Sequence, residues 1–178
     1  MNWRALSILL LIFLTLSSNS CDEGKKGQDE EQLTEEEIRE RLIEYNKSKV
    51  RTEDKIIDEY SAEHYPEIAK SETGLRYEVY SLGGEKKPES ASVCIVRYRI
   101  EDLEGDVLYS SDESGPARIQ VGHDDVASGL HEGLLYMNEG DSAVFILPSH
   151  RAYGFTGDQS KVAQNAILIY HIELIDIK

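Results

Sequence analysis

The C-terminal part of the chain alternates apolar and polar residues with the period of a β-strand. At residues 93–100, Cys94, Val96, Tyr98 and Ile100 share one face, and two arginines occupy the other. This is the pattern of a half-buried antiparallel strand. Further strands are expected at residues 75–82, 107–109, 117–121, 142–147 and 166–177. The last of these is apolar on both faces, so we expect it at the centre of a sheet.

One short helix is expected between the strands at residues 117–121 and 142–147. Leu130, Leu134 and Met137 recur at i, i+4 and i+7, which places an apolar stripe on one side of a helix. The chain then turns, and Pro148 ends the following strand because proline has no N–H to donate. A short helix between antiparallel strands predicts an α+β fold.

The region before residue 73 has helical features. Thr34 followed by Glu37 forms a capping box, so a helix is expected to start there. A second helical stretch is expected from about residue 52, ending before Pro66. The first stretch has a narrow apolar stripe, formed by Ile38, Leu42 and Tyr45. Two interpretations remain open: a charged helix resting on the folded domain, or an arm that binds clients or forms a weak homodimer.

The first 20 residues have the pattern of an export signal. Arg4 precedes an apolar run too short to span a bilayer, and small residues lead to Cys21. The sequence Ser-Asn-Ser-Cys at residues 18–21 resembles a bacterial lipoprotein signal, in which the cysteine is lipidated; a plain secretory signal is the alternative. The chain is then divided into a signal peptide (1–20), an acidic tether (21–33), a helical extension (34–72) and a folded domain (73–178).

Composition narrows the classes of function. The formal net charge is −15, which disfavours a nucleic-acid partner. If Cys21 carries lipid, Cys94 has no disulfide partner and is expected inside as a small hydrophobe. The five histidines include no i, i+4 pair, so neither a metal site nor a cofactor is expected. Signatures of phosphate-binding loops, zinc proteases and nucleophile elbows are absent from the sequence.

The candidate site is a set of aromatic and aliphatic residues where strand ends meet the short helix. On the pattern alone, a hydrophobic core is the simpler interpretation of such a set. The residues concerned are Tyr98, Tyr109, Ile119, Val126, Ala127, Leu130, Tyr153, Val162 and Tyr170.

Several ordered motifs carry a resemblance to a known family. They are Gly129-Leu130-x-Glu132-Gly133-Leu134, Met137-x-x-Gly140-Asp141-x-Ala143, Ala152-Tyr153-Gly154 and the closing residues 166–174. Together they resemble the FKBP-type peptidyl-prolyl cis/trans isomerases over residues 73–178. With Cys21 and an acidic helical region ahead of it, the chain is further similar to the FKBP-type lipoproteins associated with gliding motility in Bacteroidetes.

The resemblance implies a half-open antiparallel sheet wrapped around one short helix, and a role for each candidate residue. Leu130 would form the pocket floor. The N–H of Ala127 and the hydroxyl of Tyr153 would bind substrate carbonyls. The walls would be formed by Tyr98, Ile119, Val126, Val162 and Tyr170.

The sequence also departs from the family pattern. Where the family has Phe-Asp-Ser-Ser, this chain has Leu108-Tyr109-Ser110-Ser111. An aromatic wall residue thus becomes Leu108, and the pocket carboxylate is replaced by the phenol of Tyr109. Ala117 stands where a bulky aromatic is frequent, which widens one side of the cleft.

The function implied by the resemblance is isomerisation of X-Pro bonds in exported proteins of the cell envelope. The protein would be held by its lipid on the periplasmic side or in the outer membrane. The departures at Leu108, Tyr109 and Ala117 support an alternative, a chaperone or scaffold lipoprotein of the same fold with weak or no catalysis.

Overall fold

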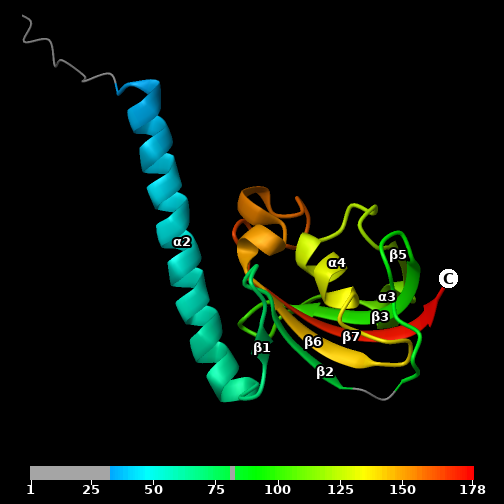
Figure 1. The fold of residues 1–178 in the computed structure, drawn as a ribbon. Helices are drawn as coiled ribbons and strands as arrows, with labels where there is room; N and C mark the ends of the chain where they lie inside the picture. Colours follow the sequence, from blue (N-terminus) through cyan, green and yellow to red (C-terminus); the bar gives the residue numbers. More distant parts are fainter. Residues whose placement is uncertain (1–32, 81–82) are drawn as a thin grey trace, which may run out of the picture. The chain divides into compact units, whose positions relative to one another are not determined.

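The computed structural model describes residues 33–80 and 83–178 (Figure 1). The export signal, Cys21 and most of the acidic tether lie outside these residues, so the expectations about them stay predictions. The chain divides into two compact units, residues 1–39 and 40–178, and the second contains the whole sheet. Among the helices described, none is both long enough and apolar enough to cross a membrane.

The described residues form one antiparallel sheet in the order β1-β2-β6-β7-β3-β4, with β5 also paired to β3. The strands are β1 (Ala69–Lys70), β2 (Arg76–Tyr80), β3 (Val93–Glu101), β4 (Val107–Ser110), β5 (Ala117–Gln120), β6 (Ser142–Leu147) and β7 (Leu168–Ile177). The expected central position of the last strand is confirmed, because β7 pairs with β6 on one side and β3 on the other. The expected α+β fold is confirmed as well.

Helix α4 (Ser128–Leu134) lies against one face of the sheet (Figure 1). The expected apolar stripe is confirmed, since Leu130, Leu134 and Met137 are all buried. Two glycines bring the helix still closer. A Cβ on Gly129 would lie 2.7 Å from Cγ of Leu147, and one on Gly133 would lie 2.6 Å from the ring of Phe145. Glycine at both positions therefore lets the backbone of α4 rest directly on β6.

Strand β6 and the first part of β7 are buried on both faces. The main apolar core lies between α4 and the sheet and includes Phe145, Leu168 and Tyr170. A smaller cluster on the other face is formed by Ile57, Val144, Ile146, Ile167 and Ile169. Since Ile57 belongs to helix α2 (Glu35–His64), this cluster packs α2 against the back of the sheet.

Helix α2 is one continuous helix of 30 residues, and the expectation of two separate helical stretches is wrong. No glycine or proline occurs between residues 35 and 64 to interrupt it. The capping box is confirmed, because the N–H of Glu37 donates to Oγ1 of Thr34 (3.2 Å) and the N–H of Thr34 donates to Oε2 of Glu37 (2.8 Å). The chain has already joined the sheet at β1, inside the stretch that the sequence assigned to the helical extension.

A buried arginine joins α2 to β2. Arg76 is 1% exposed; its guanidinium lies 2.8 Å from the carboxylate of Asp54, pairs also with Asp58, and donates to the carbonyl of Gly74 at 2.6 Å. The planar guanidinium suits this arrangement because it presents several donors at fixed angles. A short helix, α3 (Ser111–Ser114), occupies the expected polar loop, and Oγ of Ser110 caps it by accepting from the N–H of Asp112.

Candidate functional site

A cavity of about 260 Å³ lies between α4, β3, β5 and β7. The structure brings most of the sequence-predicted site residues together in its lining. These are Tyr98, Tyr109, Ile119, Val126, Leu130, Tyr153 and Tyr170. Ala117 lines the cavity as well, and the lining is mainly apolar, with Val96, Ile100 and Ile172 contributed by the central strands.

Helix α4 and strands β3 and β7 carry several of the residues that line the cavity. Leu130 on α4 is 4% exposed and Tyr170 on β7 is 1% exposed, so both are fixed by the core beneath them. Tyr98 lies on β3, where its hydroxyl forms a hydrogen bond of 2.7 Å with Oγ of Ser114 in α3. The cavity is therefore continuous with the hydrophobic core. For this reason the sequence pattern alone did not distinguish a binding site from a core.

Three sequence-predicted site residues lie elsewhere. Leu108 lines a separate cavity together with Leu103 and Lys161. Successive residues of a strand point to opposite sides, so β4 cannot direct both Leu108 and Tyr109 into one pocket. Val162 and Ala127 are buried, at 5% and 2% exposure, and lie outside the cavity lining. Ala127 is the N-terminal cap residue of α4, and its carbonyl accepts from the N–H of Leu130 at 2.9 Å.

Tyr153 and Tyr170 both line the cavity, and each phenol influences the pKa of the other. Burial, together with the negative charge of Asp158, raises the pKa of Tyr153. Burial also raises the pKa of Tyr170 well above its usual value. Both phenols therefore keep their protons at neutral pH, and the Tyr153 hydroxyl remains a hydrogen-bond donor.

Asp158 brings a carboxylate into the cavity, where the sequence predicted a phenol alone. Its Oδ1 accepts from the N–H groups of Ser160 and Val162, both at 2.8 Å, and its Oδ2 accepts from the hydroxyl of Tyr109. Burial opposes ionisation, but these hydrogen bonds outweigh it and lower the pKa of Asp158. An aspartate two residues before a serine is a common loop signal, so the sequence indicated a turn here but not its place in the pocket.

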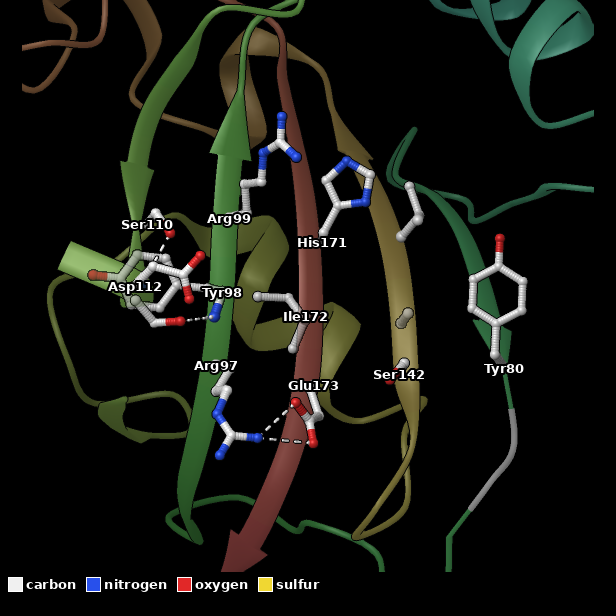
Figure 2. Close-up of a pocket in the computed structure, with 13 residues that line it drawn as sticks. Tyr80, Arg97, Tyr98, Arg99, Ser110, Asp112, Ser142, His171, Ile172 and Glu173 are labelled. Atoms are coloured by element: carbon white, nitrogen blue, oxygen red, sulfur yellow. Dashed lines mark hydrogen bonds and ion pairs between the residues drawn. The ribbon is translucent and has the colours of Figure 1, made fainter. Parts of the chain in front are cut away.

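A second hollow, of about 320 Å³, lies on the side of the sheet to which Arg97 and Glu173 point (Figure 2). Nη1 of Arg97 lies 3.0 Å from Oε2 of Glu173. The other arginine of this surface, Arg99, pairs with Glu101 at 2.5 Å, and Nε2 of His171 lies 3.6 Å from the same carboxylate. Each arginine of this surface is paired with a glutamate. A ligand would therefore meet less unpaired positive charge here than the two arginines alone suggest.

Within residues 33–80 and 83–178, no three His, Cys, Asp or Glu side chains are grouped so that they could hold a metal ion. The chemistry available in the main cavity is therefore that of an apolar pocket with phenol hydroxyls and one ionised carboxylate.

Comparison with known proteins identifies the family. The profile of the FKBP-type peptidyl-prolyl cis-trans isomerases matches residues 84–175, which contain the whole cavity. The chain belongs to this family. It is 30% identical over 111 residues to the probable FKBP-type peptidyl-prolyl cis-trans isomerase FkpA of Neisseria meningitidis, covering 62% of this chain and 40% of that protein. It is 33% identical over 112 residues to FkpA of Aeromonas hydrophila, covering 62% and 41%.

Solved structures share the fold. FkpA from Escherichia coli superimposes with a TM-score of 0.63 at 23% identity, covering 83% of this chain and 74% of that one. A peptidyl-prolyl cis-trans isomerase from Pseudomonas syringae also gives a TM-score of 0.63 at 23% identity, covering 74% and 95%. The sequence matches span less than half the length of the curated relatives.

Proposed function

We propose that this protein is a peptidyl-prolyl cis/trans isomerase that acts on proline-containing exported proteins in the cell envelope. Membership of the FKBP-type family supports this activity. The observation that carries most weight is the apolar cavity with Leu130 and Tyr153 in its lining. Its size and lining suit a proline ring and the peptide group that precedes it.

The proposed mechanism needs no nucleophile and no proton transfer. Rotation about an X-Pro bond is slow because the planar amide must lose its resonance, which costs about 18–20 kcal/mol. The twisted amide has less charge separation than the planar one. An apolar cavity therefore favours the twisted amide over the planar ground state, which lowers the barrier.

Two hydrogen-bond donors would hold the flanking peptide. The Tyr153 hydroxyl is protonated at neutral pH because its pKa is raised, so it can donate to a substrate carbonyl. The N–H of Ala127 is the second donor in this proposal, because Ala127 directly follows Val126 of the cavity lining, although its own side chain lies outside that lining. Such positioning reduces the entropy that substrate must lose on reaching the transition state.

The test is catalysis of cis/trans exchange in a proline tetrapeptide, measured by a protease-coupled assay and by exchange NMR. We expect Tyr153→Phe to lower kcat/KM by about tenfold, as for loss of one hydrogen bond in a dry site. Leu130→Ala should lower it too, by removing the pocket floor. Tyr80→Phe is the control, since Tyr80 is 42% exposed and lies outside the cavity. A folded but inactive wild-type protein would refute the proposal.

A chaperone or scaffold without useful catalysis is the second candidate. It is favoured by Leu108, which lies outside the cavity and leaves one wall without an aromatic residue. In this case, client refolding would be unaffected by Tyr153→Phe. Loss of refolding together with loss of isomerase activity would exclude it.

Anchoring by a lipid on Cys21, facing the periplasm or in the outer membrane, is part of the proposal. The similarity to gliding-motility lipoproteins further suggests clients among envelope proteins of a motility apparatus. Labelling of cells with a fatty-acid analogue should mark the wild-type protein and leave Cys21→Ser unlabelled. Equal labelling of the two proteins would exclude the anchor.

We also propose that α2 forms a weak homodimer. Ile38, Leu42 and Tyr45 are 44, 56 and 64% exposed, so an apolar stripe is open to a second copy. Sedimentation should show association that weakens when these residues are changed to serine. A profile that is monomeric at all concentrations would rule the dimer out.

A further inference from the structure

Helix α2 contacts the start of the segment that carries two polar residues of the cavity. This segment, residues 149–165, contains Tyr153 and Asp158. At its start, the carboxylate of Glu53 on α2 accepts two hydrogen bonds from Ser149, one from its N–H at 2.9 Å and one from its hydroxyl at 2.7 Å. Glu53 is 7% exposed and Ser149 is fully buried. Burying a carboxylate is costly unless it is hydrogen-bonded. The two hydrogen bonds from Ser149 offset this cost for Glu53.

The same helix also contacts the end of this segment. Nζ of Lys49 donates to Oδ1 of Asn165. The N–H of Asn165 donates in turn to the carbonyl of Gly154, at 2.8 Å. Lys49 lies one helical turn before Glu53, with its Nζ 3.6 Å from the Glu53 carboxylate. One turn of α2 therefore holds residues 149 and 165, and the cavity residues Tyr153 and Asp158 lie between them.

We propose that Glu53 and Lys49 are positioning residues for the proline-binding cavity, which act by fixing the segment with Tyr153 and Asp158. The inference rests on the proposed isomerase function. In this proposal α2 does more than link the domain to an anchor. It also stabilises the position of the site residues from outside the cavity. Neither residue lines the cavity, so their effect on catalysis has to pass through the backbone of residues 149–165.

The local structure of this segment is consistent with a need for support from α2. Within residues 149–165 the regular structure consists of two short 3-10 helices, Ser149–Arg151 and Gly154–Thr156. Such turns have few internal hydrogen bonds and do not hold a side chain in place alone. A displacement of about 1 Å at a positioned group can reduce a rate by up to about a hundredfold. The Tyr153 hydroxyl is such a group, and Tyr153 lies two residues beyond the first of these turns.

The experiment compares Glu53→Ala, Glu53→Gln and Lys49→Met in the full chain. Glu53→Gln keeps one acceptor for Ser149 and is the conservative substitution. Glu59→Gln and Lys55→Met are the matched controls, because both residues are exposed on the same helix. Isomerase kcat/KM, amide hydrogen exchange and thermal unfolding are measured on each variant.

We expect kcat/KM to fall about fivefold or more in Glu53→Ala and Lys49→Met, less in Glu53→Gln, and not in the controls. Amide exchange should accelerate across residues 150–158 while the strands β6 and β7 keep their protection. A purely structural role would instead lower the unfolding temperature and raise exchange throughout the sheet, and that result would overturn the proposal. The proposal would also be overturned if kcat/KM and amide exchange in residues 150–158 stayed within twofold of wild type in both Lys49→Met and Glu53→Ala.

Failure of the two proposals can be told apart. If wild type does not catalyse isomerisation, the proposed function fails, while the exchange measurement still decides whether α2 fixes residues 150–158. If Glu53→Ala does not fold, Lys49→Met decides the outcome, because Lys49 is 27% exposed at its side chain and less embedded than Glu53.

Discussion

The hydroxyl of Tyr109 donates a hydrogen bond to Oδ2 of Asp158, which lies 49 residues later in the chain. Tyr109 lies on β4, and Asp158 lies in the loop that closes the other side of the cavity. Nζ of Lys161 sits 5.1 Å from the centre of the Tyr109 ring, a distance that allows a cation–π contact. Tyr109 therefore holds a carboxylate that another segment of the chain supplies.

This relationship predicts strong coupling between the two side chains. Tyr109→Phe and Asp158→Asn should each lower the free energy of unfolding by about 1 kcal/mol, the usual net value of one hydrogen bond. Each should also lower kcat/KM, because residues 158–162 are organised around the carboxylate. The double variant should have nearly the same free energy of unfolding and kcat/KM as the more impaired of the two single variants. Fully additive effects in urea unfolding and in the isomerase assay would show that the pair does not act as a unit.

The contact between α4 and β6 predicts a sharp penalty at Gly133. A methyl group there would meet the ring of Phe145, which is fully buried and cannot move aside. We expect Gly133→Ala to lower the free energy of unfolding by about 1–3 kcal/mol, despite the gain in helix propensity of about 1 kcal/mol. Gly84→Ala is the control, because a Cβ at Gly84 meets no atom within 4 Å. Equal stability of the two variants in urea unfolding would contradict the close packing.

Acid should weaken the attachment of α2 through Asp54. Burial acts to raise the pKa of Asp54, but hydrogen bonds and charge from Lys70 and Arg76 outweigh it and hold the pKa below its usual value. A carboxyl whose pKa is lower in the folded state than in the unfolded state stabilises the fold above the unfolded pKa. That contribution is lost as the pH falls through the folded pKa.

The measurement is the free energy of unfolding between about pH 7 and pH 3. Wild type should lose stability mainly below about pH 4.5, and Asp54→Asn should be less stable at pH 7 and show a shallower acid loss. Asp106→Asn, at an exposed position, should follow the wild-type curve. If the free energy of unfolding of Asp54→Asn fell with pH as steeply as that of wild type, other carboxyl groups would be the cause of the loss of stability in acid.

Cys94 should be chemically inert in the folded protein. The residue is fully buried on β3, and burial raises the pKa of its thiol to about 11. Since the thiolate is the reactive form, a thiol reagent at about pH 8 should modify Cys94 only as fast as the chain unfolds. The measurement uses Cys21→Ser, so that Cys94 is the one thiol in the chain. Rapid modification without denaturant would show that β3 opens locally.

The sequence determined the fold class because its signals are local. Alternation along residues 93–100 and the double-sided apolar pattern of β7 come from the two-residue period of a strand, and both were confirmed. The capping box at Thr34 and the stripe through Leu130 depend on contacts within one turn or one helix face. The length of α2 was missed because a charged stretch with a weak apolar stripe gives little periodic signal, although nothing in it breaks a helix.

The candidate site depended in part on family resemblance, because its residues have the composition of a core. Leu130, Tyr153 and Tyr170, which the motifs indicate as site residues, line the same cavity. Leu108 lines a separate cavity. The direction of its side chain depends on the register of β4 against β3, where the ladder shifts between Ile100 and Glu101. Register follows from pairing between distant strands, which one sequence does not display.

What the sequence alone determined is the order of strands and helices, the α+β class and the family of the domain, because these depend on residues that are neighbours along the chain. Only the tertiary structure decided that Asp158 meets Tyr109 and that Glu53 meets Ser149, 49 and 96 positions apart. These contacts join segments whose approach is set by the packing of the sheet, α2 and α4. Their energies depend on burial and exact distance, which no local pattern encodes.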